Sequence, residues 1–282
     1  QEALYSYKKY KAYQPLTTYW AQQELIVHSE FRDGNVPAGH QQLRVLQEAL
    51  GHMPAGVGKV LMRSDTAGYQ TELLKYCAEG KDERFGVIEF AVGVDVTQEF
   101  KKAVAQVAEE DWYTLEREVD GHKIPTNQQW AEVCFVPNWI GHSKKSPDYR
   151  FIAIRELLEQ VPLPGMDEQL SLPFPTMELA DRGCYKVFGV VTNRDLGGNE
   201  LIWWYRQRCG KSEQAHGVMK DDLAAGKLPS GLFGANAAWW AIAVLAFNLS
   251  SAMKRLVLGK EWVSKRLKAV RFAFISLPGR VV

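Results

Sequence analysis

Residues 57–79, VGKVLMRSDTAGYQTELLKYCAE, form the stretch of sequence that decides the fold class. The run 57–63 is short and apolar, which is typical of a strand, and 71–79 has helical spacing after the break at Gly68. Asp65 lies just beyond the end of the expected strand. Open α/β sheets assemble their sites at the carboxyl ends of their strands. The stretch therefore predicts an αβ unit with Asp65 at a candidate site.

The segments before this unit predict a β-hairpin followed by a helix. β-Branched and aromatic residues dominate 14–23 and 24–32, and these two runs meet at a pair of glutamines. Residues 38–50 carry leucine and alanine at helical spacing, and the glycine- and proline-containing stretch 51–58 ends that helix. The N-terminal part of the chain is thus expected to mix strands and helices.

The segment after this unit changes to strands. Between 84 and 192 the apolar runs are mostly strand-like, with one helix expected at 98–107 and a proline-rich bridge at 161–175. From 199 onwards the apolar period becomes helical. We therefore expect an α/β fold that carries a β-rich insertion and ends in a helical part.

The helical part contains an uncharged run at 232–253 that is long enough to span a membrane. The run is rich in alanine and also holds asparagine, serine and glycine, which a membrane span disfavours. We therefore expect a buried helix of a soluble protein, with a membrane helix as the alternative. Residues 250–282 hold eight basic residues against one acidic residue, a local charge of +7. Such a tail is more often a solvated face than a nucleic-acid surface.

The whole chain of 282 residues is almost neutral, with 34 basic and 33 acidic residues. Any affinity for nucleic acid must therefore come from the distribution of charge. The four cysteines form no CxxC pair, which indicates reduced thiols in a cytosolic protein and not a zinc or redox site. The N-terminus lacks the pattern of a signal peptide, and the chain opens without methionine, so we expect a fragment.

Most motifs that would indicate a particular chemistry are absent. The stretch 51–59, GHMPAGVGK, is similar to a phosphate loop, but its lysine is displaced and no serine or threonine follows it. No GxSxG, HExxH or GxGxxG occurs, and the six histidines lack the spacing of metal ligands. The candidate chemistry must therefore come from residues outside these motifs.

One group of polar residues remains, with a carboxylate after the expected strand and four members on expected helices: Asp65, Tyr205, Arg208, Glu213 and Lys220. Glu213 and Lys220 are seven apart, which is two helical turns, and Tyr205 and Arg208 are three apart on the preceding helix. Carboxylates suit a divalent metal, and arginine, lysine and a tyrosine hydroxyl suit phosphate oxygens. The group favours phosphodiester chemistry. On spacing alone, an exposed helix surface explains Glu213 and Lys220 equally simply and is the commoner case.

The same residues resemble those of a known family. Residues 205–220 resemble the Tyr-Arg-Glu-Lys signature of bacterial insertion-sequence transposases of the DDE class, and RSDTAGYQTELLKY (63–76) resembles their second catalytic aspartate motif. KAYQPL (11–16), EFRDGN (30–35) and NAAWWAIAVLAFNLS (236–250) are similar to segments of the branch that has a β insertion before the glutamate. The likeness covers essentially the whole chain.

The resemblance implies an RNase H-like core that is interrupted by the β-rich insertion. The first part of the core is expected at 1–83, the insertion at 84–197, and the helical C-terminal part of the core, with the basic tail, at 198–282. In this family two aspartates and one glutamate surround two divalent metal ions. The long interval between Asp65 and Glu213 fits such an insertion.

The resemblance also implies a role for each residue. Asp65 is expected to be the second aspartate and Glu213 the glutamate, both as catalytic ligands of Mg²⁺ or Mn²⁺. Tyr205, Arg208 and Lys220 are expected to hold the phosphates of the transposon ends. Four residues separate Arg208 from Glu213 where the usual signature has three, so Arg208 matches the signature less well than Lys220.

The family's first aspartate lies on the first core strand, upstream of the stretch 1–16, and is not in this chain. Asp33, in the EFRDGN segment, lies at the end of a later strand and is not given this role. The expected function is cleavage and strand transfer on double-stranded DNA by a cytoplasmic homodimer without a membrane span. Without the first aspartate, the chain as it stands is expected to be inactive. The alternative is a catalytically inactive DNA-binding remnant of a transposase.

Overall fold

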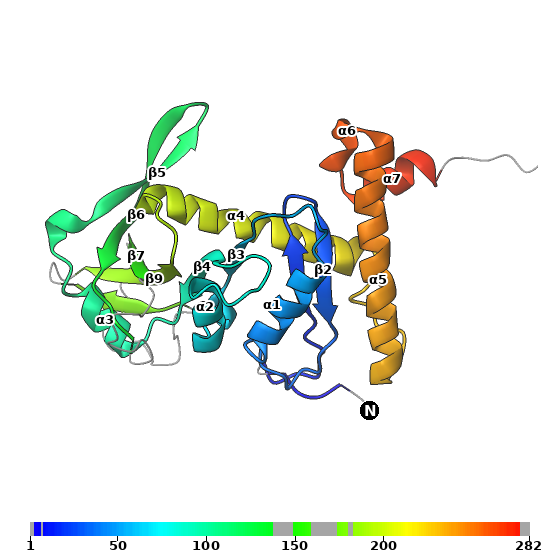
Figure 1. Ribbon diagram of the computed structural model, residues 1–282, viewed down its shortest axis with the longest axis horizontal. Coiled ribbons are helices and arrows are strands. Elements are labelled where there is room, and N and C mark those ends of the chain that lie inside the picture. The colour runs from blue at the N-terminus through cyan, green and yellow to red at the C-terminus, as the bar shows by residue number, and fades with distance from the viewer. Residues whose placement is uncertain (1–2, 7, 138–148, 159–173, 180–182, 277–282) are drawn as a thin grey trace, which may run out of the picture. The chain divides into compact units, whose positions relative to one another are not determined.

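The structure is a computed structural model that describes residues 3–6, 8–137, 149–158, 174–179 and 183–276. The chain divides into two compact units. Unit 1 comprises Gln1–Ala55 and Arg208–Val282, and unit 2 comprises Gly56–Gln207. A two-stranded sheet lies in unit 1 and a seven-stranded sheet lies in unit 2 (Figure 1).

The sheet of unit 1 is the expected hairpin. β1 (Leu16–Trp20) pairs antiparallel with β2 (Leu25–Glu30), and α1 (Gln42–Gly51) contacts both strands. The later elements of the unit are, in chain order, the end of α4 (Gly198–Gly217), the π-helix η3 (Val218–Asp222), α5 (Phe233–Met253), the π-helix η4 (Lys254–Leu258), α6 (Lys260–Val263) and α7 (Leu267–Phe274).

The core of unit 1 joins this hairpin to α4 and α5. Its buried members are apolar: Ile26, Ala215, Met219, Ala225, Trp240, Ala243 and Phe247. Polar side chains of α5 complete the contact. Asn248 donates to the Ile26 carbonyl and accepts from the Ile26 amide, both at 2.8 Å, and the Trp240 indole donates to Ser29 at 2.8 Å. The Asn248 amide thus bonds β2 as a neighbouring strand would.

Replacing Asn248 with alanine is expected to destabilise unit 1 by about 1–3 kcal/mol, because the Ile26 backbone groups lose both partners. Asn248→Asp keeps an acceptor for the Ile26 amide but loses the donor, so we expect a further loss from placing an acidic oxygen beside the Ile26 carbonyl. Urea unfolding followed by circular dichroism measures both changes. Wild-type stability in Asn248→Ala would contradict a structural role for this amide.

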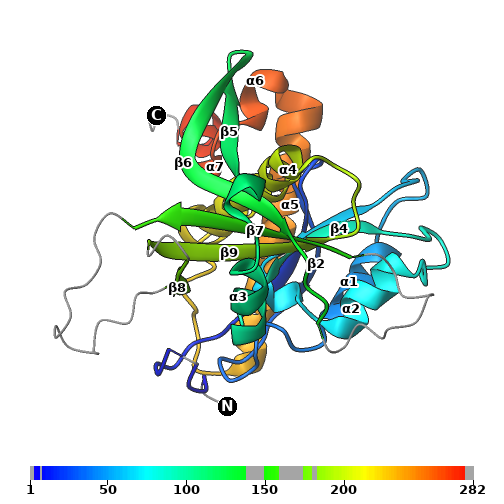
Figure 2. The ribbon, with the colours of Figure 1, turned by 90° about the vertical axis from the view of Figure 1, so that its left-hand side faces the viewer.

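The sheet of unit 2 has the strand order β3-β4-β9-β7-β6-β5, with β8 paired to β9 (Figure 2). Its strands are β3 (Leu61–Ser64), β4 (Glu89–Val94), β5 (Tyr113–Val119), β6 (His122–Val133), β7 (Arg150–Leu157), β8 (Thr176–Glu178) and β9 (Cys184–Thr192). β3 and β4 are parallel, and every other pair in this sheet is antiparallel. The parallel pair carries the unit with Asp65.

Helices cover both faces of this sheet. Val190 of β9 belongs to one buried cluster with Leu201 of α4. The neighbouring Gly189 faces the ring of Phe100 on α3 (Gln98–Val104). Successive residues of a strand point to opposite faces, so α4 and α3 lie on opposite sides of the sheet, as Figure 2 shows. The helix that follows Asp65 is α2 (Thr71–Ala78), and it packs near β4.

The α/β class expected from the sequence is confirmed, and so are the hairpin and the strand–helix unit around Asp65. Some boundaries differ, and part of the chain lies outside the described residues. The strand before Asp65 begins at Leu61 and not at residue 57. Most of the proline-rich bridge expected at 161–175 lies outside the described residues.

The two helices expected around residues 200 and 213 are one helix, α4, and this expectation was wrong. α4 continues through Gly210, because a glycine costs a helix only about 1 kcal/mol and does not interrupt its hydrogen bonds. Beyond Gly217 the chain changes to the π-helix η3, which contains Lys220. A π-helix turns less per residue than an α-helix, so Glu213 and Lys220 are not related by two α-helical turns as expected.

The uncharged run forms α5, but the expectation of a buried helix was largely wrong. Buried residues of α5 follow one stripe that includes Trp240, Ala243 and Phe247. Among the described residues, one helix, Phe233–Leu258, is long and apolar enough to cross a membrane, and 17% of its most apolar window is buried. A hairpin of two strands offers α5 a contact surface on one side only.

Candidate active site

Asp65 lies at the start of a tight turn at the carboxyl end of β3. It is the N-cap of the 3₁₀ helix η1 (Thr66–Gly68), and its side chain accepts a hydrogen bond from the Ala67 amide at 3.1 Å. Gly68 closes the turn against the Ser64 side chain, where a larger residue would collide. The carboxylate is exposed to solvent. The turn therefore holds Asp65 in one orientation and leaves oxygen atoms free for a ligand.

Tyr205 of α4 approaches this turn across Gly93 of β4. A Cβ atom at Gly93 would lie 2.9 Å from the Tyr205 hydroxyl and 3.2 Å from the Thr66 amide nitrogen. The hydroxyl and the residue after Asp65 thus approach the same point, and only glycine leaves space for both. Two of the residues chosen from the sequence, Asp65 and Tyr205, are brought together in unit 2.

Arg63 links the same strand to α4 and was not selected from the sequence. Its guanidinium donates to the Trp204 carbonyl at 2.6 Å and lies 5.0 Å from the centre of the Trp204 ring. A weaker contact of 3.5 Å reaches the Gln207 side chain. Arg63 precedes Asp65 by two positions, the strand period, and this spacing was the available signal. Arg63 therefore ties the turn of α4 that carries Tyr205 to the strand before Asp65.

The other three residues chosen from the sequence belong to unit 1. Arg208 is partly buried on α4, and its guanidinium contacts the Cys209 sulfur at 3.7 Å. Glu213, later on α4, and Lys220, in η3, are exposed. Asp65 belongs to unit 2, so its convergence with Glu213 stays a prediction.

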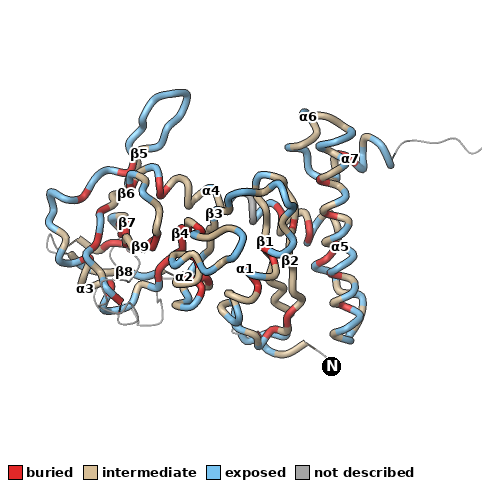
Figure 3. Tube along the Cα trace, viewed as in Figure 1, coloured by how far each residue is buried: buried red, intermediate tan, exposed pale blue. Residues whose placement is uncertain are grey.

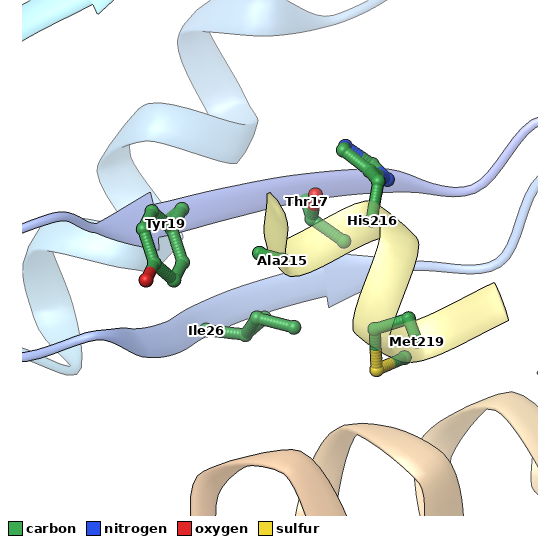
Figure 4. Close-up of a pocket in the computed structure, with 6 residues that line it drawn as sticks. All are labelled: Thr17, Tyr19, Ile26, Ala215, His216 and Met219. Atoms are coloured by element: carbon green, nitrogen blue, oxygen red, sulfur yellow. The ribbon is translucent and has the colours of Figure 1, made fainter. Parts of the chain in front are cut away.

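A small pocket in unit 1 lies where the end of α4 meets the hairpin (Figure 4). His216 and Met219 line it from the helical side, and Thr17, Tyr19 and Ile26 line it from the strands. Burial, and less strongly the charge of Lys220, lowers the pKa of His216, so this imidazole is uncharged at neutral pH. The pocket residue His216 lies three positions beyond Glu213, at the end of α4 that packs on the hairpin.

The basic tail is only partly available for a nucleic acid. Arg266 forms an ion pair with the buried carboxylate of Asp222 at 2.7 Å, and Lys254 donates to the carbonyls of Val263 and Lys265 at 3.1 and 3.2 Å. These cations hold the tail together. The side chains of Lys260, Lys265 and Lys268 are exposed. From the sequence, all basic residues of the tail were counted together. The structure separates the cations that bond within the tail from those that are exposed to solvent.

Comparison with protein families identifies the chain. The family described as Transposase DDE domain group 1 matches residues 1–282. The chain belongs to this family. No curated protein and no solved structure gives a significant match.

Family membership confirms several expectations in general form. DDE transposases act on DNA as nucleases and strand transferases, and they generally use divalent metal ions. The seven-stranded mixed sheet with its flanking helices is compatible with an RNase H-like transposase core. The resemblance seen in the sequence is therefore confirmed at the level of the family.

Proposed function

We propose that this protein is a DNA transposase that cleaves and joins phosphodiester bonds at the ends of an insertion sequence. The observation that carries the proposal is the geometry around Asp65. An exposed carboxylate follows β3, and the Tyr205 hydroxyl lies beside its turn. Family membership over residues 1–282 supports the same function.

The carboxylates fit a divalent metal of the Mg²⁺ class. Asp65 and Glu213 both offer hard oxygen ligands to solvent, and within the described part of the chain neither forms an ion pair. We propose that both residues bind metal, with two ions, Mg²⁺ or Mn²⁺, in the complete site. Bound ions of this kind stabilise the attacking and the leaving oxygen of an in-line displacement.

The remaining residues would orient the DNA. Tyr205 is positioned to donate a hydrogen bond to a phosphate oxygen beside Asp65, and Arg208 and Lys220 would neutralise phosphate charge along the transposon end. Arg63 has a positioning role, because its contacts with α4 set where the Tyr205 hydroxyl lies. We further propose that the protein acts in the cytoplasm as a homodimer on double-stranded DNA.

A catalytically inactive DNA-binding remnant is the second candidate function, and Asp33 favours it. Asp33 is an aspartate in a family-like segment, but one of its oxygens accepts from the Leu4 and Gly34 amides at 2.7 and 2.8 Å. These bonds use one Asp33 oxygen to hold the surrounding backbone, and we do not assign Asp33 as the third carboxylate. On this reading Lys220 and Arg208 bind transposon ends without cleavage.

Strand cleavage separates the two candidates. Duplexes that carry the ends of the element are incubated with the protein and either Mg²⁺ or Mn²⁺, and nicked products are resolved on denaturing gels. Without the family's first aspartate this chain is expected to make no nicks, whereas the transposase proposal expects metal-dependent nicks, stopped by EDTA, from a form of the protein that also carries the first-aspartate strand. Specific binding of the ends by that longer form, with no nick under any metal condition, would support the remnant instead.

Lys220→Ala is expected to weaken DNA binding and to flatten its salt dependence. Each phosphate contact that is lost lowers the slope of log affinity against log salt concentration by about 0.9. Titrations by fluorescence anisotropy at several salt concentrations measure the slope. Lys102→Ala is the matched control, because Lys102 is exposed on α3, on the opposite side of the sheet from α4. An unchanged slope in Lys220→Ala would remove Lys220 from the interface.

A further inference from the structure

α5 exposes large apolar side chains on the side opposite its packed stripe. Figure 3 shows buried and exposed segments alternating along this helix. Ile242, Leu245 and Leu249 are 60, 59 and 61% exposed, and Leu256 in the adjoining η4 is 81% exposed. Monomeric proteins rarely expose so continuous an apolar surface, and such surfaces usually mark a contact with a protein or a membrane.

The exposed residues form a regular seam. Successive members are three or four positions apart: Ala235, Ala238, Ile242, Leu245, Leu249 and Met253. This is the spacing of the a and d positions through which helices pack against one another. No charged residue occurs between 232 and 253, so nothing on α5 opposes burial of the seam.

We propose that the seam of α5 is a dimer interface in which two copies of this chain pair their α5 helices antiparallel about a two-fold axis. The proposed function includes a homodimer on DNA, and this inference adds which residues form the contact between the two copies. The pairing needs neither DNA nor metal, and it can therefore be tested apart from the proposed activity.

The sizes of the seam residues favour the antiparallel arrangement. The first two members, Ala235 and Ala238, are small, and the last two, Leu249 and Met253, are large. In an antiparallel pair the large end of one helix meets the small end of the other, so knobs face holes along the contact. Pairing Ala238 with Met253 and Ile242 with Leu249 of the other copy places Leu245 next to its own copy at the two-fold axis.

Charge favours the same arrangement. Lys254 and Arg255 follow α5 directly, and the N-terminal end of α5 has no charged residue. A parallel pair would place these cations beside their copies, where like charges repel. In an antiparallel pair they lie at opposite ends of the contact, and the two helix dipoles are opposed, which is also favourable.

A membrane surface is the competing occupant. The opposite face of α5 is already used, because Asn248 and Trp240 are hydrogen-bonded to β2. A membrane span would have to break these bonds and expose their polar groups to lipid. A helix lying flat on a membrane would keep these hydrogen bonds, and vesicle sedimentation tests that alternative.

The mass of the protein in solution is measured by light scattering without DNA or metal. The chain has a mass of 31.9 kDa, and we expect a dimer of twice that mass. Leu245→Glu with Leu249→Glu is expected to weaken dimerisation at least about a hundredfold, because each copy would bury charge in an apolar contact. Ile124→Glu is the control, since Ile124 is also exposed but lies on the β5–β6 hairpin. Circular dichroism checks that each variant is folded.

Cysteine cross-linking tests the direction of pairing. Leu245→Cys is expected to form a disulfide-linked dimer on oxidation, whereas Ala238→Cys is not, because an antiparallel pair separates the two copies of residue 238 by roughly 22 Å along the helix axis. The unsubstituted chain shows the background from its own four cysteines. Cross-linking of both variants would mean a parallel pair and would overturn the proposal.

Three further results would also overturn it. A monomeric wild-type chain removes the dimer, and a dimer unaffected by the two glutamates places the interface elsewhere. Sedimentation of a monomeric chain with phosphatidylserine vesicles, lost in the double glutamate variant, would assign the seam to a membrane surface.

Discussion

In a form of the protein that also carries the family's first-aspartate strand, Asp65→Asn and Glu213→Gln are each expected to reduce metal-dependent DNA cleavage at least about a thousandfold. Metal ligands in such a site supply several kcal/mol of transition-state stabilisation, and each 1.36 kcal/mol corresponds to a factor of ten in rate. Both substitutions keep the shape of the side chain and remove its charge. The rate of nicking on duplexes with the element's ends measures the effect.

The controls separate metal binding from charge and folding. Glu72→Gln is the control, because it removes an exposed carboxylate from α2. It is expected to cleave at the wild-type rate. DNA binding without metal should be unchanged or tighter in Asp65→Asn and Glu213→Gln, because each removes a negative charge near phosphate. Cleavage that persists in either variant would exclude that residue as a metal ligand.

Gly93→Ala is expected to reduce cleavage roughly 10- to 100-fold with a smaller effect on DNA affinity. The added methyl group would lie 2.9 Å from the Tyr205 hydroxyl and 3.2 Å from the Thr66 amide nitrogen, so α4 or the Asp65 turn must shift. A misplacement of about 1 Å at a reacting centre can cost a hundredfold in rate. Cleavage rate and DNA affinity are measured separately on the same duplex.

A double substitution tests whether Tyr205 is the residue displaced. Tyr205→Phe removes the hydroxyl that the new methyl group would meet, so Gly93→Ala should cost less in the Tyr205→Phe background than in the wild type. Gly58→Ala is the control, because a Cβ atom at Gly58 has nothing within 4 Å. Equal costs of Gly93→Ala in both backgrounds would show that the damage does not pass through Tyr205.

The sequence was most informative where a short local pattern was sufficient. Asp65 was placed after a strand and before a helix because strand and helix periods change within a few residues of it. The hairpin of β1 and β2 was found for the same reason. The signature around Glu213 was recognised by resemblance. Family membership confirms the family, and the role of Glu213 stays a prediction.

Other features had no local signal. The approach of Tyr205 to the Asp65 turn depends on Gly93, which is more than a hundred positions from Tyr205 and is one of 23 glycines in the chain. The link from Arg63 to Trp204 likewise joins two elements separated by the whole β-rich segment. Such contacts are set by which strand lies next to which helix, and strand order is not encoded in any single stretch of sequence.

The uncharged run 232–253 shows the division most clearly. Its composition by itself determined that this stretch is an apolar helix without charged side chains. Only the tertiary structure decided that one stripe of the helix packs on a two-stranded hairpin while the opposite seam is exposed. Apolar composition determines how much free energy a helix gains when its surface is buried. The partner that the fold offers determines which side of the helix is buried.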